Sequence, residues 1–171
     1  MPASADQVGK LTSIPAEELQ VRLRAYFAAQ SPEEPTSSVG PLKELKGGWA
    51  NSLYAFTLQQ GGSNGQLPRD LVIKMYSPDA RGLEHADREW RALTQLGATG
   101  YPVPRIECYE LGGRSLGRPF IVMDSIPGIA FWDVFEAADP AGQTRLTQKF
   151  VAPLVALHEV EPRVLWLRKH A

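Results

Sequence analysis

Leu71-Val72-Ile73-Lys74-Met75-Tyr76 is a short apolar run that carries one lysine. Leucine, valine, isoleucine and tyrosine favour a largely buried β-strand. The lysine ammonium in such a strand needs an anionic partner, because burying an unpaired charge is costly. The run therefore supports two interpretations. Either Lys74 holds the phosphates of a nucleotide, or the strand lies at a sheet edge where the lysine side chain reaches water.

The segments around this run alternate between strand and helix patterns. Residues 42–46 and 54–58 predict two strands that form an antiparallel meander with 71–76, because the connections are too short for a crossover helix. A helix is expected over 83–96, with Gly97 as its C-cap. The remaining elements are a helix at 15–29, strands at 105–110 and 119–123, and helices at 131–137 and 145–158.

This order of elements predicts an α+β fold. A five-stranded antiparallel sheet has one helix inserted after its third strand, an N-terminal helix before it and further helices after it. We expect residues 1–39 to form the N-terminal helix and a linker. Residues 40–126 then form the sheet domain, and residues 127–171 form the helices that follow it.

Composition excludes several classes of protein. Of the 171 residues, 18 are Lys or Arg and 19 are Asp or Glu, so no basic excess favours nucleic acid or an anionic membrane. No apolar stretch is long enough to span a bilayer, and residues 1–6 do not resemble a secretory signal. Cys108 is the only cysteine, which rules out an internal disulfide and a CxxC metal site. These features favour a cytoplasmic protein.

Four features occur in a characteristic order. They are the glycine-containing segment 47–51 between the first two strands, Lys74, Glu89 on the following helix, and the apolar run 120–126 that leads into a linker. In this order the sequence resembles the kinase-like fold, and within it the aminoglycoside phosphotransferase family of small-molecule kinases. The resembling segments are 45–54, 72–74, 88–93, 103–106 and 116–128. Segments 103–106 and 116–128 look most like the branch of the family that is related to the kinase-like domain fused to some acyl-CoA dehydrogenases.

The resemblance implies a role for individual residues. Lys74 would contact the α- and β-phosphates of ATP and pair with Glu89. Val72 and Met123 would line the adenine site. Asp124 would offer its backbone carbonyl, and Ile126 its backbone N–H, to the adenine edge. The loop over the phosphates would contain Gly47, Gly48 and Asn51.

Simpler interpretations of the same residues stay open at this point. Gly47 and Gly48 are also typical of a hairpin turn. Glu89 is also compatible with a solvated helix face, and Met123 with an ordinary core position.

The residues that would complete phosphoryl transfer are not found in this sequence. The reaction needs an aspartate that orients the nucleophile, an asparagine and a second aspartate for Mg²⁺. The asparagines are Asn51 and Asn64, and the aspartates after Asp124 are Asp133 and Asp139. We therefore expect no catalytic and no metal-binding residue here. The chain is expected to be the truncated, ATP-binding half of a small-molecule phosphotransferase, inactive alone, with Mg²⁺ bound only in a full-length protein.

The expected partners are a nucleotide and a small-molecule acceptor of unknown identity, without nucleic acid or membrane. The alternative is a non-catalytic kinase-like module that acts in binding or interaction. Apolar side chains that follow the sheet would lie uncovered and promote self-association. They are Phe131, Trp132, Phe135, Leu154, Leu157, Leu165 and Trp166.

Overall fold

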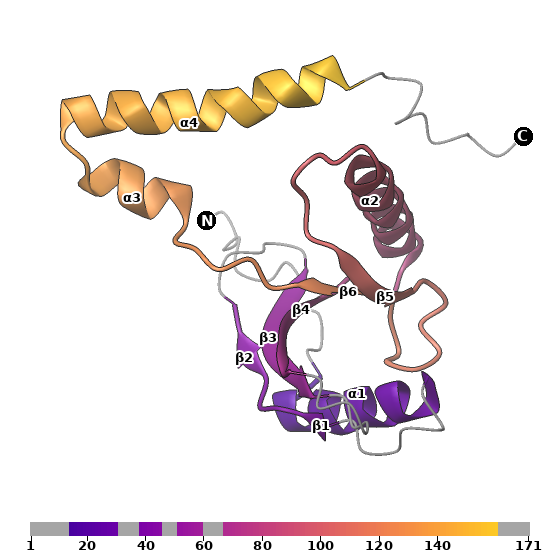
Figure 1. The fold of residues 1–171 in the computed structure, drawn as a ribbon. Coiled ribbons are helices and arrows are strands. Elements are labelled where there is room, and N and C mark those ends of the chain that lie inside the picture. Colours follow the sequence, from indigo (N-terminus) through magenta and orange to yellow (C-terminus); the bar gives the residue numbers. More distant parts are fainter. Residues whose placement is uncertain (1–13, 31–37, 46–50, 60–66, 161–171) are drawn as a thin grey trace, which may run out of the picture. The chain divides into compact units, whose positions relative to one another are not determined.

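The computed structural model describes residues 14–30, 38–45, 51–59 and 67–160, and it confirms the α+β fold class (Figure 1). The residue contacts divide the chain into two compact units, which we describe in turn. The first is Met1–Trp90 with Ile106–Ser125, and the second is Arg91–Arg105 with Ile126–Ala171. The elements are α1 (Ala16–Gln30), β1 (Ser38–Val39), β2 (Lys43–Glu44), β3 (Ser52–Gln59), β4 (Arg69–Met75), α2 (Ala80–Ala98), β5 (Ile106–Glu110), β6 (Phe120–Asp124), α3 (Phe131–Ala137) and α4 (Pro140–Glu159).

The first unit contains one antiparallel sheet with the strand order β1-β3-β4-β6-β5, and β2 also pairs with β3. All five predicted strands are present. The sequence does not predict β1, since two residues are too few to show an alternating pattern. Strand β4 lies inside the sheet between β3 and β6, so the interpretation of Lys74 as an edge-strand lysine is wrong.

The two faces of the sheet differ in what covers them. Side chains alternate along a strand, and the buried residues Leu71, Ile73 and Met75 of β4 all point to one face. They share a hydrophobic core with Leu19 and Leu23 of α1, so this helix covers that face. We call it the α1 face. The helix predicted at residues 15–29 is therefore confirmed as α1.

The opposite face of the sheet carries the lysine. In the strand pairing Val72 lies between Ala55 and Met123, and Lys74 lies between Leu53 and Ile121. Residues opposite each other in antiparallel strands point to the same side. These six residues therefore lie on one face, which we call the Lys74 face: Leu53, Ala55, Val72, Lys74, Ile121 and Met123.

Helix α2 begins and ends at residues that differ from those predicted. It begins at Ala80 because the Asp79 carboxylate accepts the Gly82 N–H at 2.8 Å, which caps the helix. Gly97 lies within the helix, so its prediction as the C-cap is wrong. The helix is terminated by Gly100, with φ 80°, while the N–H groups of Gly100 and Tyr101 bond back into the last turn.

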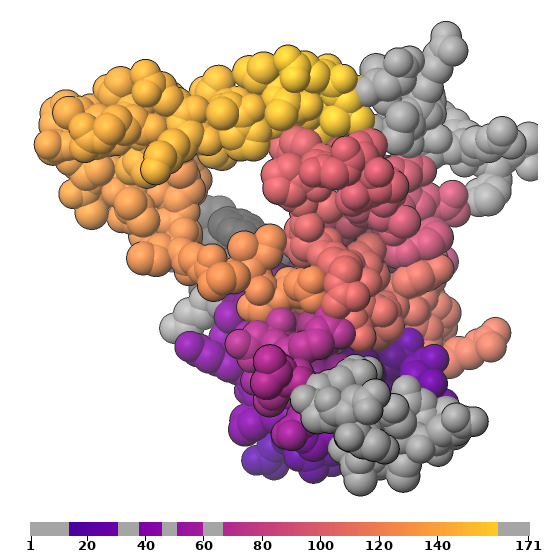
Figure 2. Space-filling model, in the orientation of Figure 1, coloured from indigo at the N-terminus to yellow at the C-terminus, as the bar shows by residue number. Residues whose placement is uncertain are grey.

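The second unit contains α3 and α4, drawn in orange to yellow in Figure 2. Helix α4 begins five residues before the predicted position, because Asp139 caps it through the Gly142 N–H and Pro140 occupies its first turn. The Phe131 ring packs 4.9 Å from that of Phe150, between ring centroids. Among the described residues, no helix is long and apolar enough to cross a membrane.

Candidate functional site

Lys74 and Glu89 form a close ion pair in the first unit. The Lys74 ammonium donates hydrogen bonds to both carboxylate oxygens of Glu89, at 2.8 Å to Oε1 and 2.6 Å to Oε2. Both side chains are partly buried, with 21% of Lys74 and 32% of Glu89 exposed. Two charge-assisted hydrogen bonds to one carboxylate hold the Lys74 ammonium in a fixed position beside the sheet. Glu89 is thus a partner of Lys74 and not simply a solvated helix residue.

The apolar residues expected near adenine lie beside this ion pair. Val72 lies directly opposite Met123 in the β4–β6 pairing. It is two residues from Lys74 along β4 and points to the same face. Met123 is buried, with 8% of its surface exposed, and Val72 is half-buried. The structure therefore brings Lys74, Glu89, Val72 and Met123 together.

Tyr76 is a residue near the ion pair that the sequence did not single out. Its ring lies 5.4 Å from the Lys74 ammonium, and 1% of the residue is exposed. Burial raises the pKa of the Tyr76 phenol above its usual range, and the charge of Glu89 adds to this rise. Among the described residues, the hydroxyl has no hydrogen-bond partner with acceptable geometry. The ring thus provides an apolar and aromatic support for the ammonium.

The chain leaves the sheet after Asp124 with a defined backbone direction. The Ser125 N–H donates to the Asp70 carbonyl at 2.9 Å, which extends the β4–β6 pairing by one residue. Hydrogen-bonded and non-hydrogen-bonded pairs alternate in antiparallel strands, so the backbone groups of Asp124 point away from β4. Ile126 begins the second unit, and 64% of it is exposed.

The predicted phosphate loop is only partly described. Gly47 and Gly48 lie outside the described residues. Asn51 immediately precedes β3 and is half-buried. The roles assigned to these three residues stay predictions.

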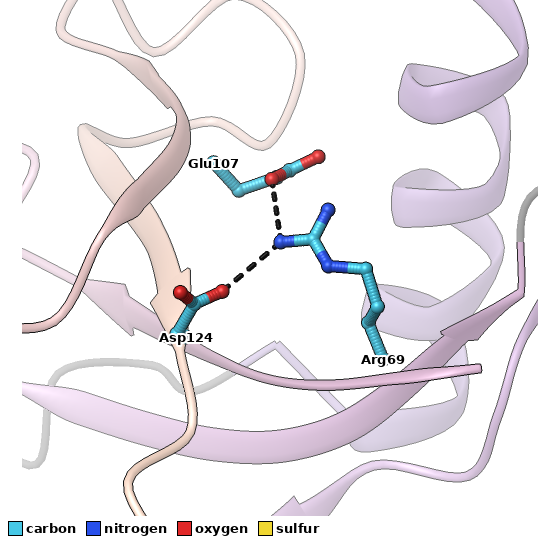
Figure 3. A network of polar contacts seen from close by, with 3 residues as sticks. All are labelled: Arg69, Glu107 and Asp124. Atoms are coloured by element: carbon cyan, nitrogen blue, oxygen red, sulfur yellow. Dashed lines mark hydrogen bonds and ion pairs between the residues drawn. The ribbon is translucent and has the colours of Figure 1, made fainter. Parts of the chain in front are cut away.

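A second ionic contact joins the ends of three strands, and sequence reasoning missed it (Figure 3). Nη2 of Arg69 on β4 lies 2.8 Å from Glu107 Oε2 on β5 and 3.0 Å from Asp124 Oδ1 on β6. The hydrogen bond to Glu107 raises the pKa of Arg69, and Asp124 adds to the rise while burial opposes it. The sequence gives no signal for this contact. Its residues come from three different strands, and the position of Glu107 in the sheet depends on a β-bulge between Ile106 and Cys108.

Comparison with known proteins agrees with this geometry. The model of the phosphotransferase enzyme family (APH) matches residues 41–170, and the chain belongs to this family. No curated protein matches the sequence. A crystal structure from Ralstonia eutropha JMP134, of a protein assigned as an aminoglycoside phosphotransferase, is similar with a TM-score of 0.57 and 23% identity.

That similarity covers 88% of this chain and 41% of the other chain. This chain therefore spans about two fifths of the solved structure, and it matches the N-terminal portion. The kinase-like N-lobe expected from the resemblance is confirmed as the fold of the sheet and its helices.

Proposed function

We propose that this chain binds ATP on the Lys74 face. The observation that carries the proposal is the ion pair of Lys74 with Glu89 on an interior strand, beside the apolar pair Val72 and Met123. In this proposal Lys74 contacts the α- and β-phosphates, and Glu89 holds the lysine side chain in place.

The remaining residues complete the nucleotide site in this proposal. Val72 and Met123 contact the adenine ring. Asp124 and Ile126 offer backbone groups to its edge. The loop over the phosphates contains Gly47, Gly48 and Asn51. In the same proposal residues 40–126 act as the N-lobe, 1–39 precede it and 127–171 follow it.

The described residues fit this ligand chemically. A phosphate chain needs a fixed cation, and the Lys74 ammonium is one. An adenine ring needs a flat apolar surface and polar backbone groups at its edge, which suits Val72, Met123 and the backbone direction of Asp124. Bound ATP would supply the phosphoryl group that the family transfers.

We further propose that these 171 residues do not transfer the phosphoryl group by themselves. The two asparagines, Asn51 and Asn64, both precede the hinge, which is the segment that leaves the sheet after Asp124. Neither Asp133 nor Asp139 is followed by an asparagine. The pair of residues that orients the nucleophile and holds Mg²⁺ in kinases is therefore not formed by this sequence. The acceptor in this proposal is a hydroxyl group of a small molecule.

Lys74→Ala is expected to weaken Mg-ATP binding by about 10- to 100-fold, since charge-assisted hydrogen bonds contribute roughly 1.5–3 kcal/mol. The affinity is measured by an NMR-monitored titration of the chain with Mg-ATP, which detects millimolar binding. The matched control is Lys149→Ala, which removes an exposed lysine of α4 and leaves the affinity unchanged. Equal binding by the wild-type chain and Lys74→Ala contradicts the proposal, as does no binding by the wild type.

We also propose that the chain self-associates through apolar side chains of α3 and α4. Trp132 and Leu154 are 64% and 41% exposed, and Phe131, Phe135 and Leu157 are half-buried. Leu165 and Trp166 lie outside the described residues. Exposed apolar side chains of this kind favour association. Light scattering should give a mass above that of the monomer, and Trp132→Ser with Leu154→Ser should reduce it. A monodisperse wild-type monomer contradicts this proposal.

A further inference from the structure

The sheet meets the hinge at an ionic contact formed by Arg69, Glu107 and Asp124. Nη2 of Arg69 contacts both carboxylates. Each carboxylate oxygen lies within about 3 Å of Arg69 Nη2, so the two oxygens are less than about 6 Å apart. Two negative charges at this separation repel each other unless a cation lies between them. Arg69 therefore holds the ends of β5 and β6 together, as Figure 3 shows.

This ionic contact lies on the α1 face. Arg69 and Leu71 are two residues apart on β4 and point to the same side, and Asp124 is directly opposite Leu71. Lys74 points to the other side. A nucleotide on the Lys74 face therefore does not touch Arg69, and any effect of Arg69 on it must pass through the backbone.

The backbone that would pass on this effect is that of Asp124. Its side chain is held by Arg69, while its backbone groups point away from β4. The next residue, Ser125, is fixed to β4 through the Asp70 carbonyl at 2.9 Å. Two separate contacts thus set the direction of the chain at the hinge.

We propose that Arg69 is a positioning residue for the base of the nucleotide. By holding Asp124 and Glu107 together, it fixes the backbone edge that receives adenine and does not affect the phosphates held at Lys74. This inference rests on the proposed binding of ATP to the Lys74 face. It goes further by assigning selectivity for the base to an ionic contact on the opposite face.

The experiment compares two ligands that share phosphates but not a base. Mg-ATP and Mg-tripolyphosphate are titrated into the wild-type chain, Arg69→Met, Arg69→Lys and the control Arg22→Met. Arg22 lies in an exposed ion pair with Glu18 on α1, so its loss removes an ionic contact that involves none of the residues Arg69, Glu107 and Asp124. Lys74→Ala identifies binding at the Lys74 face, since it should weaken both ligands.

Arg69→Met is expected to weaken ATP about tenfold, because the backbone edge at Asp124 is then no longer fixed before adenine binds, and to leave tripolyphosphate within about twofold. Arg69→Lys should restore part of the affinity for ATP, because an ammonium keeps the charge but not the geometry of the guanidinium. Arg22→Met should change neither ligand.

Other outcomes overturn the inference in distinguishable ways. Unchanged ATP binding by Arg69→Met overturns it while the proposed function stands. An equal loss of both ligands shows a general structural role and overturns it too. No binding of either ligand by the wild type removes the proposed function itself. If Arg69→Met does not fold, Glu107→Gln decides instead, because it weakens the same contact and should selectively reduce ATP affinity about threefold.

Discussion

Gly82→Ala is expected to lower the free energy of unfolding by at least about 3 kcal/mol. A Cβ atom at Gly82 would lie 1.9 Å from the Ser77 carbonyl oxygen, 2.6 Å from its carbonyl carbon and 2.7 Å from its nitrogen. These are backbone atoms, so no side-chain rotation relieves the overlap. The turn between β4 and α2 must move instead.

The same movement should disturb the nucleotide site. Gly82 lies in the first turn of α2, where its N–H is bound by Asp79, and Glu89 lies two turns further along that helix. Displacing the start of α2 changes the distance between Lys74 and Glu89. We therefore expect Gly82→Ala to weaken Mg-ATP binding as well as stability.

Gly97→Ala is the matched control for this substitution. Gly97 lies in the same helix, and its added Cβ would meet only a Val103 methyl group at 3.6 Å, an ordinary contact. Alanine favours a helix over glycine by about 0.8–1 kcal/mol, so Gly97→Ala should be neutral or stabilising. Urea unfolding followed by circular dichroism measures both variants. Equal midpoints would contradict the predicted overlap at Gly82.

Leu23→Ala is expected to lower the free energy of unfolding by about 3 kcal/mol, within the range for a buried leucine that leaves a cavity. Leu23 is fully buried in α1 and shares the core with Phe56 of β3 and Ile73 of β4. The prediction therefore tests whether α1 is an integral part of the sheet domain. Urea unfolding of the whole chain measures the effect.

Val21→Ala on the same helix separates core packing from helix propensity. Val21 is 63% exposed, and its truncation should change stability by no more than about 0.5 kcal/mol. If Leu23→Ala behaves like Val21→Ala, α1 does not contribute to the core as described.

Much of the fold could be predicted because local patterns agree with the tertiary structure. The apolar stripe of α1 and the alternating residues of β3 follow from spacing and residue type. The pairing of Lys74 with Glu89 is implied by the resemblance to the kinase-like fold, and the structure contains it. The start of α4 was missed although Asp139-Pro140 is a recognisable signal for a helix N-terminus. The interior position of β4 depends on β6, which joins it only in the folded sheet.

Other features carry no local signal. Gly97 and Gly100 are both plausible ends for α2, and the backbone conformation that distinguishes them forms only when the helix meets the following turn. The contact of Arg69 with Glu107 and Asp124 joins residues from three strands through a bulge. Tyr76 resembles any other buried tyrosine in the sequence.

The position of α1 has a practical consequence for shortening this chain. The family match begins at residue 41, whereas the hydrophobic core already includes Leu19 of α1. A fragment cut to the matched residues would keep every strand from β2 onward but expose Tyr54, Phe56 and Ile73 to water. The boundary of sequence similarity is therefore not a boundary of folding, and a stable fragment should start before Ala16.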